Sequence, residues 1–441
     1  MQESSQKNQF IGPTYREALA VWLRIGLLSF GGPSGQIALM HRMLVDERKW
    51  IDDGRFLNAL NFCMLLPGPE AMQLATYIGW RLHGVRGGLT AGLLFVLPGA
   101  FVVLALSMIY AAFGNVPTIE ALFLGIKAAV LVIVIEALLR IAKRALKGRE
   151  HWVLAALSFV AIFFFGAPYP LLVLAAAIIG YVVSARQVTS ATSAAATEAV
   201  HGVPLAKTVA SAGLWLAIWI LPLLAVAAIF GKGHVLAQIG YFFSKLAIVT
   251  FGGAYAVLAY MGQDVATQYG WITAGEMMDG LGLAETTPGP LILVTEFVGY
   301  IAGYRHGGAG PSLAMGVAGA VITLWATFAP CFLWVFTGGP YVEWLNSQPK
   351  LKGALAGVTA AVVGVILNLA IWFALHVFFS RVTPRSVGIL KLWVPDLATL
   401  DWRIVALAAI SAFLLLWRHW NVIAVLAVAS AGSLLLRLAG V

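Results

Sequence analysis

Three basic side chains lie inside apolar stretches of this sequence, where a charge is costly. Arg24 lies in the run Ala18–Phe30, and Lys245 has the matching place 221 residues later. Lys127 lies within a third apolar stretch, between Thr118 and Leu139. A charge deep in a bilayer costs at least about 2.5 kcal/mol on insertion scales and usually faces a cavity or a partner. The three cations therefore predict an anion near the middle of the protein.

A structural role for these cations is the alternative, and Lys245 could also extend its ammonium group toward the membrane surface. A buried salt bridge could use any of four carboxylates, namely Glu70, Glu136, Glu285 and Glu296. Three of the four, Glu70, Glu285 and Glu296, lie near proline-rich motifs and could instead carry a proton in a coupled cycle. The sequence leaves both roles open.

Two motifs of glycine and proline follow the cations, and both recur at one offset. The offset is 221 residues, the distance from Phe30 to Phe251. The residues concerned are Phe30, Gly31, Gly32, Pro33 and Ser34 with Pro67, Gly68, Pro69 and Glu70, then Phe251, Gly252 and Gly253 with Pro288, Gly289 and Pro290. Glycine and proline free backbone groups from a helix, which lipid does not tolerate unless protein or water satisfies them. We interpret the motifs as helix breaks that line a cavity, although kinks needed only for packing remain an alternative.

Each break is expected to start a new helix, whose free N–H groups and positive dipole end attract anions. Pro33-Ser34 and Pro69-Glu70 have this place in the first half, and Pro290 has it in the second. Ala254 replaces the proline that follows the first F-G-G motif. We therefore expect the first half to dominate an anion site.

The shared offset predicts two related halves. We divide the chain into a first domain, 1–186, a cytoplasmic linker, 187–210, and a second domain, 211–441. An extra helix at about 213–230 has no counterpart in the first half, so one additional crossing would invert the second half. Inverted repeats are typical of transporters with a site at the midplane. A parallel duplication is the alternative.

The composition requires a lipid environment. Of the 441 residues, 61% are hydrophobic and only 11% are charged, whereas soluble proteins carry about 25% charged residues. The fold class expected is an all-α polytopic membrane protein with broken or re-entrant helical hairpins and about 9–10 spanning helices.

The net charge of +9 does not indicate nucleic acid, because the basic residues cluster between apolar runs as the positive-inside rule expects. The densest cluster is Arg140, Lys143, Arg144, Lys147 and Arg149. We place this cluster and the N-terminus in the cytoplasm. No cofactor fingerprint or metal-ligand spacing is present in the sequence, so no cofactor or metal is expected.

Two long stretches resemble the chromate ion transporter (CHR) family in its long-chain, two-domain form. Residues 30–88 begin FGGPSGQIALM and contain LLPGPEAMQ, and residues 251–303 begin FGGAYAVLAYM and contain TTPGPLILV. The resemblance implies a carrier of the bacterial inner membrane that expels chromate, driven by the membrane potential or a proton gradient, and confers chromate resistance. It also implies that the F-G-G and P-G-P residues are the functional motifs, and it suggests sulfate as a related substrate because the two dianions are nearly isosteric.

Other functions remain open at this point. The chain could carry sulfate or another oxyanion, exchange anions as an antiporter, or form a passive anion channel. We do not expect an enzyme, because a chromate reductase would need a flavin, haem or iron–sulfur site. The sequence does not determine the oligomeric state, and a homodimer is one arrangement open to it.

Overall fold

The protein is almost entirely helical in a computed structural model, which describes residues 12–114, 116–190, 204–251 and 253–440. Of the predicted site residues, Gly252 lies outside this described part. Five described helices are long and apolar enough to cross a membrane, and four shorter apolar helices accompany them. The prediction of an all-α polytopic membrane protein is confirmed.

The first half begins with short helices separated by the predicted breaks. Helices α1 (Tyr15–Leu28) and α2 (Gly32–His41) flank the F-G-G break, and a π-helical turn (Arg42–Glu47) follows α2. Helices α3 (Asp53–Leu65) and α4 (Glu70–Phe113) flank the P-G-P break. With 10 to 14 residues, α1, α2 and α3 are too short to cross the ~30 Å hydrocarbon core alone. The predicted broken helices are therefore confirmed in the first half.

Helix α4 is a helical hairpin, because the backbone of His83 and Gly84 is not helical. The close approach of its two arms is made by glycine: a Cβ atom on Gly79 would lie 2.5 Å from the carbonyl oxygen of Gly87. The longer arm leads to α5 (Pro117–Ala145), α6 (Arg149–Phe165) and α7 (Tyr169–Ser190).

The second half repeats this order. Helices α9 (Val235–Val249) and α10 (Ala254–Thr267) flank its F-G-G break, and α11 (Ala274–Thr286) precedes its P-G-P break. A 3₁₀ turn (Leu291–Leu293), α12 (Val294–His306) and α13 (Leu313–Gly338) match the two arms of α4. The remaining helices are α14 (Val342–Ser347), α15 (Pro349–Phe378), α16 (Trp402–Ala412), which ends in a π-helical turn (Phe413–Trp417), and α17 (Val422–Leu438).

A two-stranded antiparallel hairpin, β1 (Val382–Val387) and β2 (Leu390–Pro395), lies between α15 and α16. The sequence analysis does not predict it. The hairpin is largely exposed and carries Pro384 within β1, which weakens any pattern of alternating hydrophobic residues.

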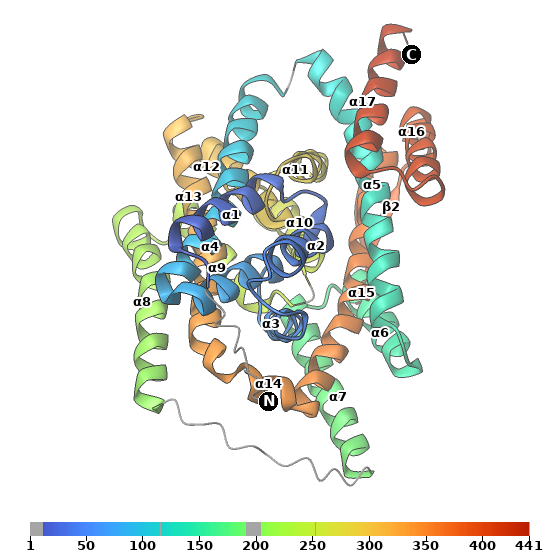
Figure 1. Cartoon of the computed structure of the whole chain (residues 1–441). Coiled ribbons are helices and arrows are strands. Elements are labelled where there is room, and N and C mark those ends of the chain that lie inside the picture. Colours follow the sequence, from blue (N-terminus) through green and yellow to red (C-terminus); the bar gives the residue numbers. More distant parts are fainter. Residues whose placement is uncertain (1–11, 115, 191–203, 252, 441) are drawn as a thin grey trace, which may run out of the picture.

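The two halves exchange equivalent contacts. Helix α5 packs against α16 and α17, and its counterpart α15 packs against α6 and α7 (Figure 1). Small residues permit both approaches, because a Cβ atom on Gly125 would lie 2.2 Å from the carbonyl oxygen of Ala429, and one on Gly357 would lie 2.4 Å from that of Ala176. Reciprocal contacts of this kind are the property of a two-fold relation. The two halves therefore make equivalent contacts with each other through α5 and α15.

Helix α8 (Leu205–Phe230) covers the segment at about 213–230 where the sequence predicts an extra helix. It lies at the edge of the molecule beside α9 and α13 (Figure 1). It starts earlier than predicted, and α7 continues to Ser190, so the predicted linker 187–210 is partly helical at both ends. Its middle, 191–203, lies outside the described residues.

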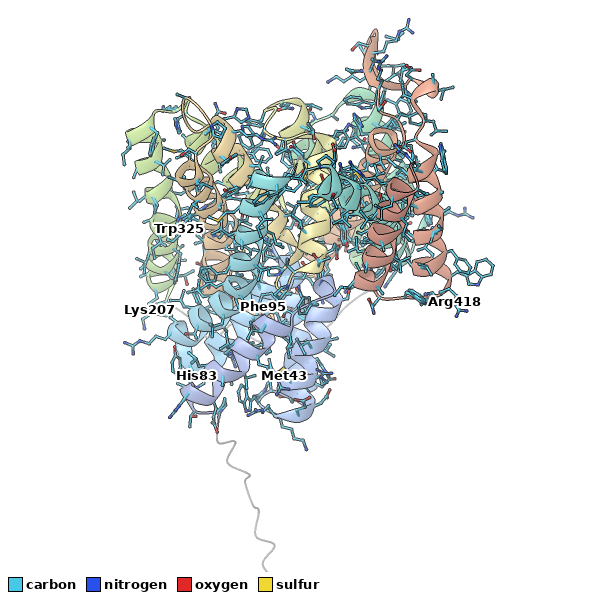
Figure 2. The ribbon with its side chains drawn as sticks, turned by 90° about the horizontal axis from the view of Figure 1, so that it is seen from above. Met43, His83, Phe95, Lys207, Trp325 and Arg418 are labelled. Atoms are coloured by element: carbon cyan, nitrogen blue, oxygen red, sulfur yellow. The ribbon has the colours of Figure 1, made fainter. Side chains whose placement is uncertain are left out.

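The short helices of the first half form a lobe on one side of the molecule, with Met43 and His83 at its far end (Figure 2). Phe95 on α4 is fully buried where this lobe meets the other helices (Figure 2). Lys207 and Arg418 project from the outer surface (Figure 2).

Candidate functional site: a basic cavity between the helix breaks

A cavity of about 560 Å³ lies between helix breaks of both halves. It is lined by Pro33 and Ser34 at the start of α2, Gly68 and Glu70 at the start of α4, and Gly253 with neighbours at the start of α10. Three helix N-termini therefore end at one cavity. Their unpaired N–H groups and positive dipole ends favour an anion there.

Two backbone hydrogen bonds join the breaks across the halves. The N–H of Gly68 donates to the carbonyl oxygen of Thr250 at 2.9 Å, and the N–H of Gly289 donates to that of Ser29 at 2.8 Å. The two bonds are equivalent under the sequence repeat, since each partner is displaced by the same offset. The F-G-G break of one half is thus held by the P-G-P break of the other.

Positive φ angles explain why glycine occupies these turns. Gly68 has φ of 120° and Gly289 has φ of 95°, values at which any other residue is strained. Amide side chains complete the polar contacts of the same breaks: Gln73 donates to the carbonyl oxygen of Pro67 at 2.7 Å and buried Gln36 to that of Gly289 at 2.6 Å. The breaks are therefore supported inside the protein, as the low polarity of lipid requires.

Four basic side chains line the same cavity, and we call them the basic rim: Arg140, Arg144, Lys147 and Lys352. Arg140 and Arg144 belong to the last turns of α5, and Lys147 follows that helix. Lys352 comes from the start of α15. Arg140 also pairs with Glu136, at 3.3 Å between Nη2 and Oε2. The basic rim gives the cavity a net positive charge, although the cavity is also lined by the carboxylate of Glu70.

Glu70 is the acidic side chain that lines this cavity within the described part of the chain. Its carboxylate lies beside Gly253, the residue that precedes α10: a Cβ atom on Gly253 would be 3.3 Å from Oε1. Tyr255 of α10 also lines the cavity and donates its hydroxyl hydrogen to buried Glu285, at 2.7 Å. Arg144 lines the same cavity as Glu70, and the two side chains do not form an ion pair.

Two predicted cations lie away from the cavity. Arg24 is exposed on the outer face of α1, and Phe30 is 38% exposed. Lys245 is exposed on α9, with Nζ 5.7 Å from the ring centroid of Tyr260. The structure therefore does not bring the repeated pair, Arg24 and Lys245, together with the breaks, and their part in anion binding stays a prediction.

Lys127 forms an ion pair with Asp279 of α11, at 3.3 Å between Nζ and Oδ2. The hydroxyl of Tyr110 donates to the same carboxylate oxygen at 2.8 Å. The partner differs from the four carboxylates considered in the sequence, because α11 of the second half packs on α5 of the first. This geometry favours a structural role for Lys127, and a direct part in anion binding stays a prediction.

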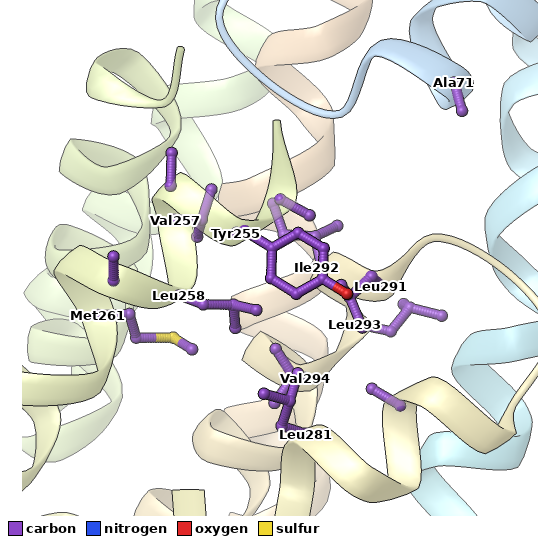
Figure 3. Close-up of a cluster of buried hydrophobic side chains, with 14 of the residues drawn as sticks. Ala71, Tyr255, Val257, Leu258, Met261, Leu281, Leu291, Ile292, Leu293 and Val294 are labelled. Atoms are coloured by element: carbon purple, nitrogen blue, oxygen red, sulfur yellow. The ribbon is translucent and has the colours of Figure 1, made fainter. Parts of the chain in front are cut away.

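The second P-G-P break does not open on the cavity. Pro288 and Gly289 pack against Gly99 of α4, where a Cβ atom would lie 2.1 Å from the carbonyl oxygen of Pro288. After Pro290, the side chains Leu291, Ile292 and Leu293 join a buried apolar cluster with Tyr255 (Figure 3). Of the predicted motif and site residues, the structure thus gathers six in one cavity, with Pro67 and Pro69 flanking it: Pro33, Ser34, Gly68, Glu70, Phe251 and Gly253.

The basic rim was missed as part of a site. Its α5 members belong to the densest basic cluster of the sequence, which the positive-inside rule already explains. Lys352 lies far away in sequence. Tyr255 is the repeat equivalent of Ser34, 221 residues later, and that correspondence could have identified it. The part of the chain that the structure describes contains no group of three or more side chains suited to hold a metal ion.

Known proteins place the chain in a family. The family model for chromate transporters matches residues 16–181 and 237–434. A chromate transport protein of Pseudomonas aeruginosa is 35% identical over 382 residues, covering 85% of this chain and 84% of the relative. A chromate transport protein of Cupriavidus metallidurans is 30% identical, covering 82% of this chain and 84% of the relative.

Half-length and more distant relatives exist as well. An uncharacterized transporter of Bacillus subtilis is 35% identical over 153 residues, which is 34% of this chain and 75% of the relative. No solved structure matches the chain. The match across both halves and the long relatives lead to one conclusion: this multi-pass membrane protein belongs to the chromate transporter family.

Proposed function

We propose that the protein is a secondary transporter of chromate, and that the cavity between the helix breaks is its anion site. The observation that carries the proposal is the meeting of three helix N-termini and the basic rim at one cavity of about 560 Å³. Charge-assisted hydrogen bonds from guanidinium, ammonium and backbone N–H groups are those a tetrahedral oxyanion prefers. Both long relatives carry the name chromate transport protein.

The arrangement suits transport better than permanent binding. The basic rim residues Arg140, Arg144 and Lys352 are exposed to the cavity and its mouth, so an anion there keeps a route to water. A few cations and helix ends attract a dianion without enclosing it. We therefore assign the cavity to the open state of a carrier, in which the anion enters and leaves from the side of the basic rim.

The basic rim includes most of the cluster that the positive-inside rule assigns to the cytoplasm. We propose that the cavity faces the cytoplasm, that the N-terminus lies on that side of a bacterial inner membrane, and that the halves are inverted. The reciprocal contacts of α5 and α15 support a two-fold relation, and the added helix α8 supports inversion. Export of chromate would follow, with the interior-negative membrane potential driving a dianion outward.

Transport into inverted vesicles tests this function. Radiolabelled chromate should enter saturably, and faster with an imposed membrane potential of the appropriate sign. Sulfate should compete, because the cavity offers charge and N–H donors and not a chromium-specific ligand. Flux that does not respond to any gradient would indicate a passive channel. Absence of both binding and flux for chromate would overturn the proposal, and sulfate uptake alone would assign the site to sulfate.

A further inference from the structure

Glu70 stands out within the cavity, because a carboxylate lies in a site otherwise built for an anion. It is the first residue of α4 and lies beside Gly253, which precedes α10. Its carboxylate therefore lies between two helix N-termini that would attract a substrate anion. We propose that Glu70 is an internal substitute for the substrate: its carboxylate occupies the anion site when the site is empty, and it must take up a proton when the oxyanion binds.

The described contacts of Glu70 do not hold its carboxylate in place, so a substrate anion could displace it from the site. In the described part of the chain, no cation forms an ion pair with Glu70, that is, none has a nitrogen within 4.0 Å of its carboxylate oxygens. Arg144 lines the same cavity. By contrast, Asp279 is fixed by Lys127 and Tyr110, and Glu285 by Tyr255. Among these carboxylates, Glu70 alone borders the cavity and lacks a charged or hydroxyl partner that would hold it.

The charged and titratable groups around Glu70 come from several elements. They are the basic rim, His151 at the start of α6, Tyr255 of α10 and Cys63 of α3. The rim supplies four positive charges, and Glu70 offsets one of them. A dianion bound beside an ionised Glu70 would place three negative charges in one cavity, and such like-charge contacts disfavour the ionised form.

Protonation of Glu70 resolves this conflict. In the step proposed, a proton from water binds the Glu70 carboxylate while the oxyanion takes its place between the helix N-termini. No covalent bond to the substrate forms, and the site changes by one negative charge instead of two. Linkage then requires that binding of the dianion raise proton affinity and that protons raise anion affinity by the same factor. The proposal rests on the proposed function, because it assumes that this cavity is the anion site.

The sequence repeat supplies a contrast. Leu291 stands at the position equivalent to Glu70, is 3% exposed, and lies in the apolar cluster of the second P-G-P break. A carboxylate is therefore not needed to shape the break itself. Its presence at the P-G-P break that borders the cavity, and its absence from the P-G-P break that does not, point to a role in handling the anion.

Proton uptake on chromate binding tests the proposal directly. Purified full-length protein in weakly buffered detergent solution at about pH 8, where chromate is a dianion, is mixed with chromate while bound chromate and pH are measured. We expect about one proton taken up per chromate bound, and a fall in chromate affinity of about tenfold per pH unit above the pKa of Glu70. Glu70→Gln should bind chromate with no proton uptake and with little dependence on pH.

Two further variants make the assignment specific. Glu296→Gln removes another buried carboxyl, one whose Oε2 has no hydrogen-bond partner among the described residues, and it should keep the proton uptake. Glu285→Gln should keep it as well. Loss of uptake in Glu285→Gln or Glu296→Gln, or persistence in Glu70→Gln, would overturn the assignment.

The wild-type protein decides the matter even if Glu70→Gln does not fold. Chromate binding without proton uptake would overturn the inference and leave the proposed function intact. Absence of chromate binding would overturn the proposed function as well, so the two failures are distinguishable.

Discussion

The two P-G-P breaks share a backbone and differ in what surrounds them. Gly68 and Gly289 make equivalent hydrogen bonds to Thr250 and Ser29 of the opposite half. The first break is followed by Glu70 and borders the cavity, whereas the second is followed by Leu291 and is packed against Gly99.

A similar difference separates two equivalent positions on the long helices α5 and α15. The motif Gly125 with Ala128-Ala129-Val130 of α5 recurs as Gly357 with Ala360-Ala361-Val362 of α15, which makes Thr359 the counterpart of Lys127. Lys127 is paired with Asp279, whereas Thr359 lines the open cavity. The comparison teaches that the two halves share the backbone of their breaks and differ in side chains. The surroundings of Glu70 and Thr359 are polar and open to the cavity, whereas those of Leu291 and Lys127 are closed by packing or by an ion pair. A carrier needs this inequality in any single state, because only one side of the site is open at a time.

The largest expected effect comes from exchanging the side chains that follow the two breaks. Leu291→Glu places a carboxyl group without a partner in the apolar cluster and removes a buried leucine, which together cost more than about 4 kcal/mol. We expect this variant not to fold, whereas Glu70→Leu should fold because its position borders the cavity. Detergent-based size-exclusion profiles and melting curves measure both. Equal stability of the two variants would contradict the difference drawn between the breaks.

The next effect concerns the closed side. Lys127→Met leaves Asp279 as a buried carboxylate without its cation, and breaking such a pair costs roughly 3–5 kcal/mol. The double variant Lys127→Met with Asp279→Asn should recover much of the lost stability, since no charge is then left unpaired. Melting temperatures of the single and double variants give the coupling. An unchanged melting temperature in Lys127→Met would show that the ion pair does not hold the closed side.

A smaller effect, on transport, compares a cation inside the cavity with one outside it. Arg144→Gln removes a charged donor to the anion, worth about 2 kcal/mol, or roughly thirty-fold in chromate affinity. Arg24→Gln is the matched control, because Arg24 is exposed on the outer face of α1, and it should change transport by less than about twofold. Vesicle uptake at several chromate concentrations measures both. A larger loss in Arg24→Gln would restore the repeated cations to the site and displace the basic rim.

The smallest effect concerns His41, the last residue of α2, and the polar connection that follows it, outside the helices long enough to span a membrane. The hydrogen bond that His41 donates through Nε2 to Asp53 and the nearby charge of Asp46 raise the pKa of His41 above its usual 6.5. A raised pKa in the folded state means that His41 stabilises the protein fully below pH 6.5 and ceases to do so as pH rises through the folded pKa.

His41→Gln should remove this part of the pH dependence of stability. The change in melting temperature is expected to be small because Asp46 and Asp53 are both exposed. The equivalent position of the second half is Gly262, so that connection should show no matching dependence. Melting curves recorded from pH 5.5 to pH 8.5 on both proteins check it. A wild-type protein that gains stability over this range relative to His41→Gln would contradict the sign.

The sequence by itself determined the membrane class, the repeated motifs and the positions of the F-G-G and P-G-P breaks, but not the break at His83 and Gly84 inside α4. These features depend on local composition: long apolar runs require lipid, and the closely spaced glycines and prolines of the F-G-G and P-G-P motifs interrupt a helix. The starts of α2, α4 and α10 follow from the same residues.

Only the tertiary structure decided which of these residues meet. Arg24 and Lys245 keep their matched places in sequence, yet the rotation of α1 and α9 turns both outward. Lys127 pairs with Asp279, and Arg144 and Lys352 line one cavity, because α5 and α15 pack against helices of the opposite half. A repeat fixes the spacing of side chains along each helix, but the face that each helix turns toward its neighbours depends on packing between distant segments. The P-G-P break at Gly68 therefore borders the cavity and its copy at Gly289 does not, because different distant segments pack around the two breaks.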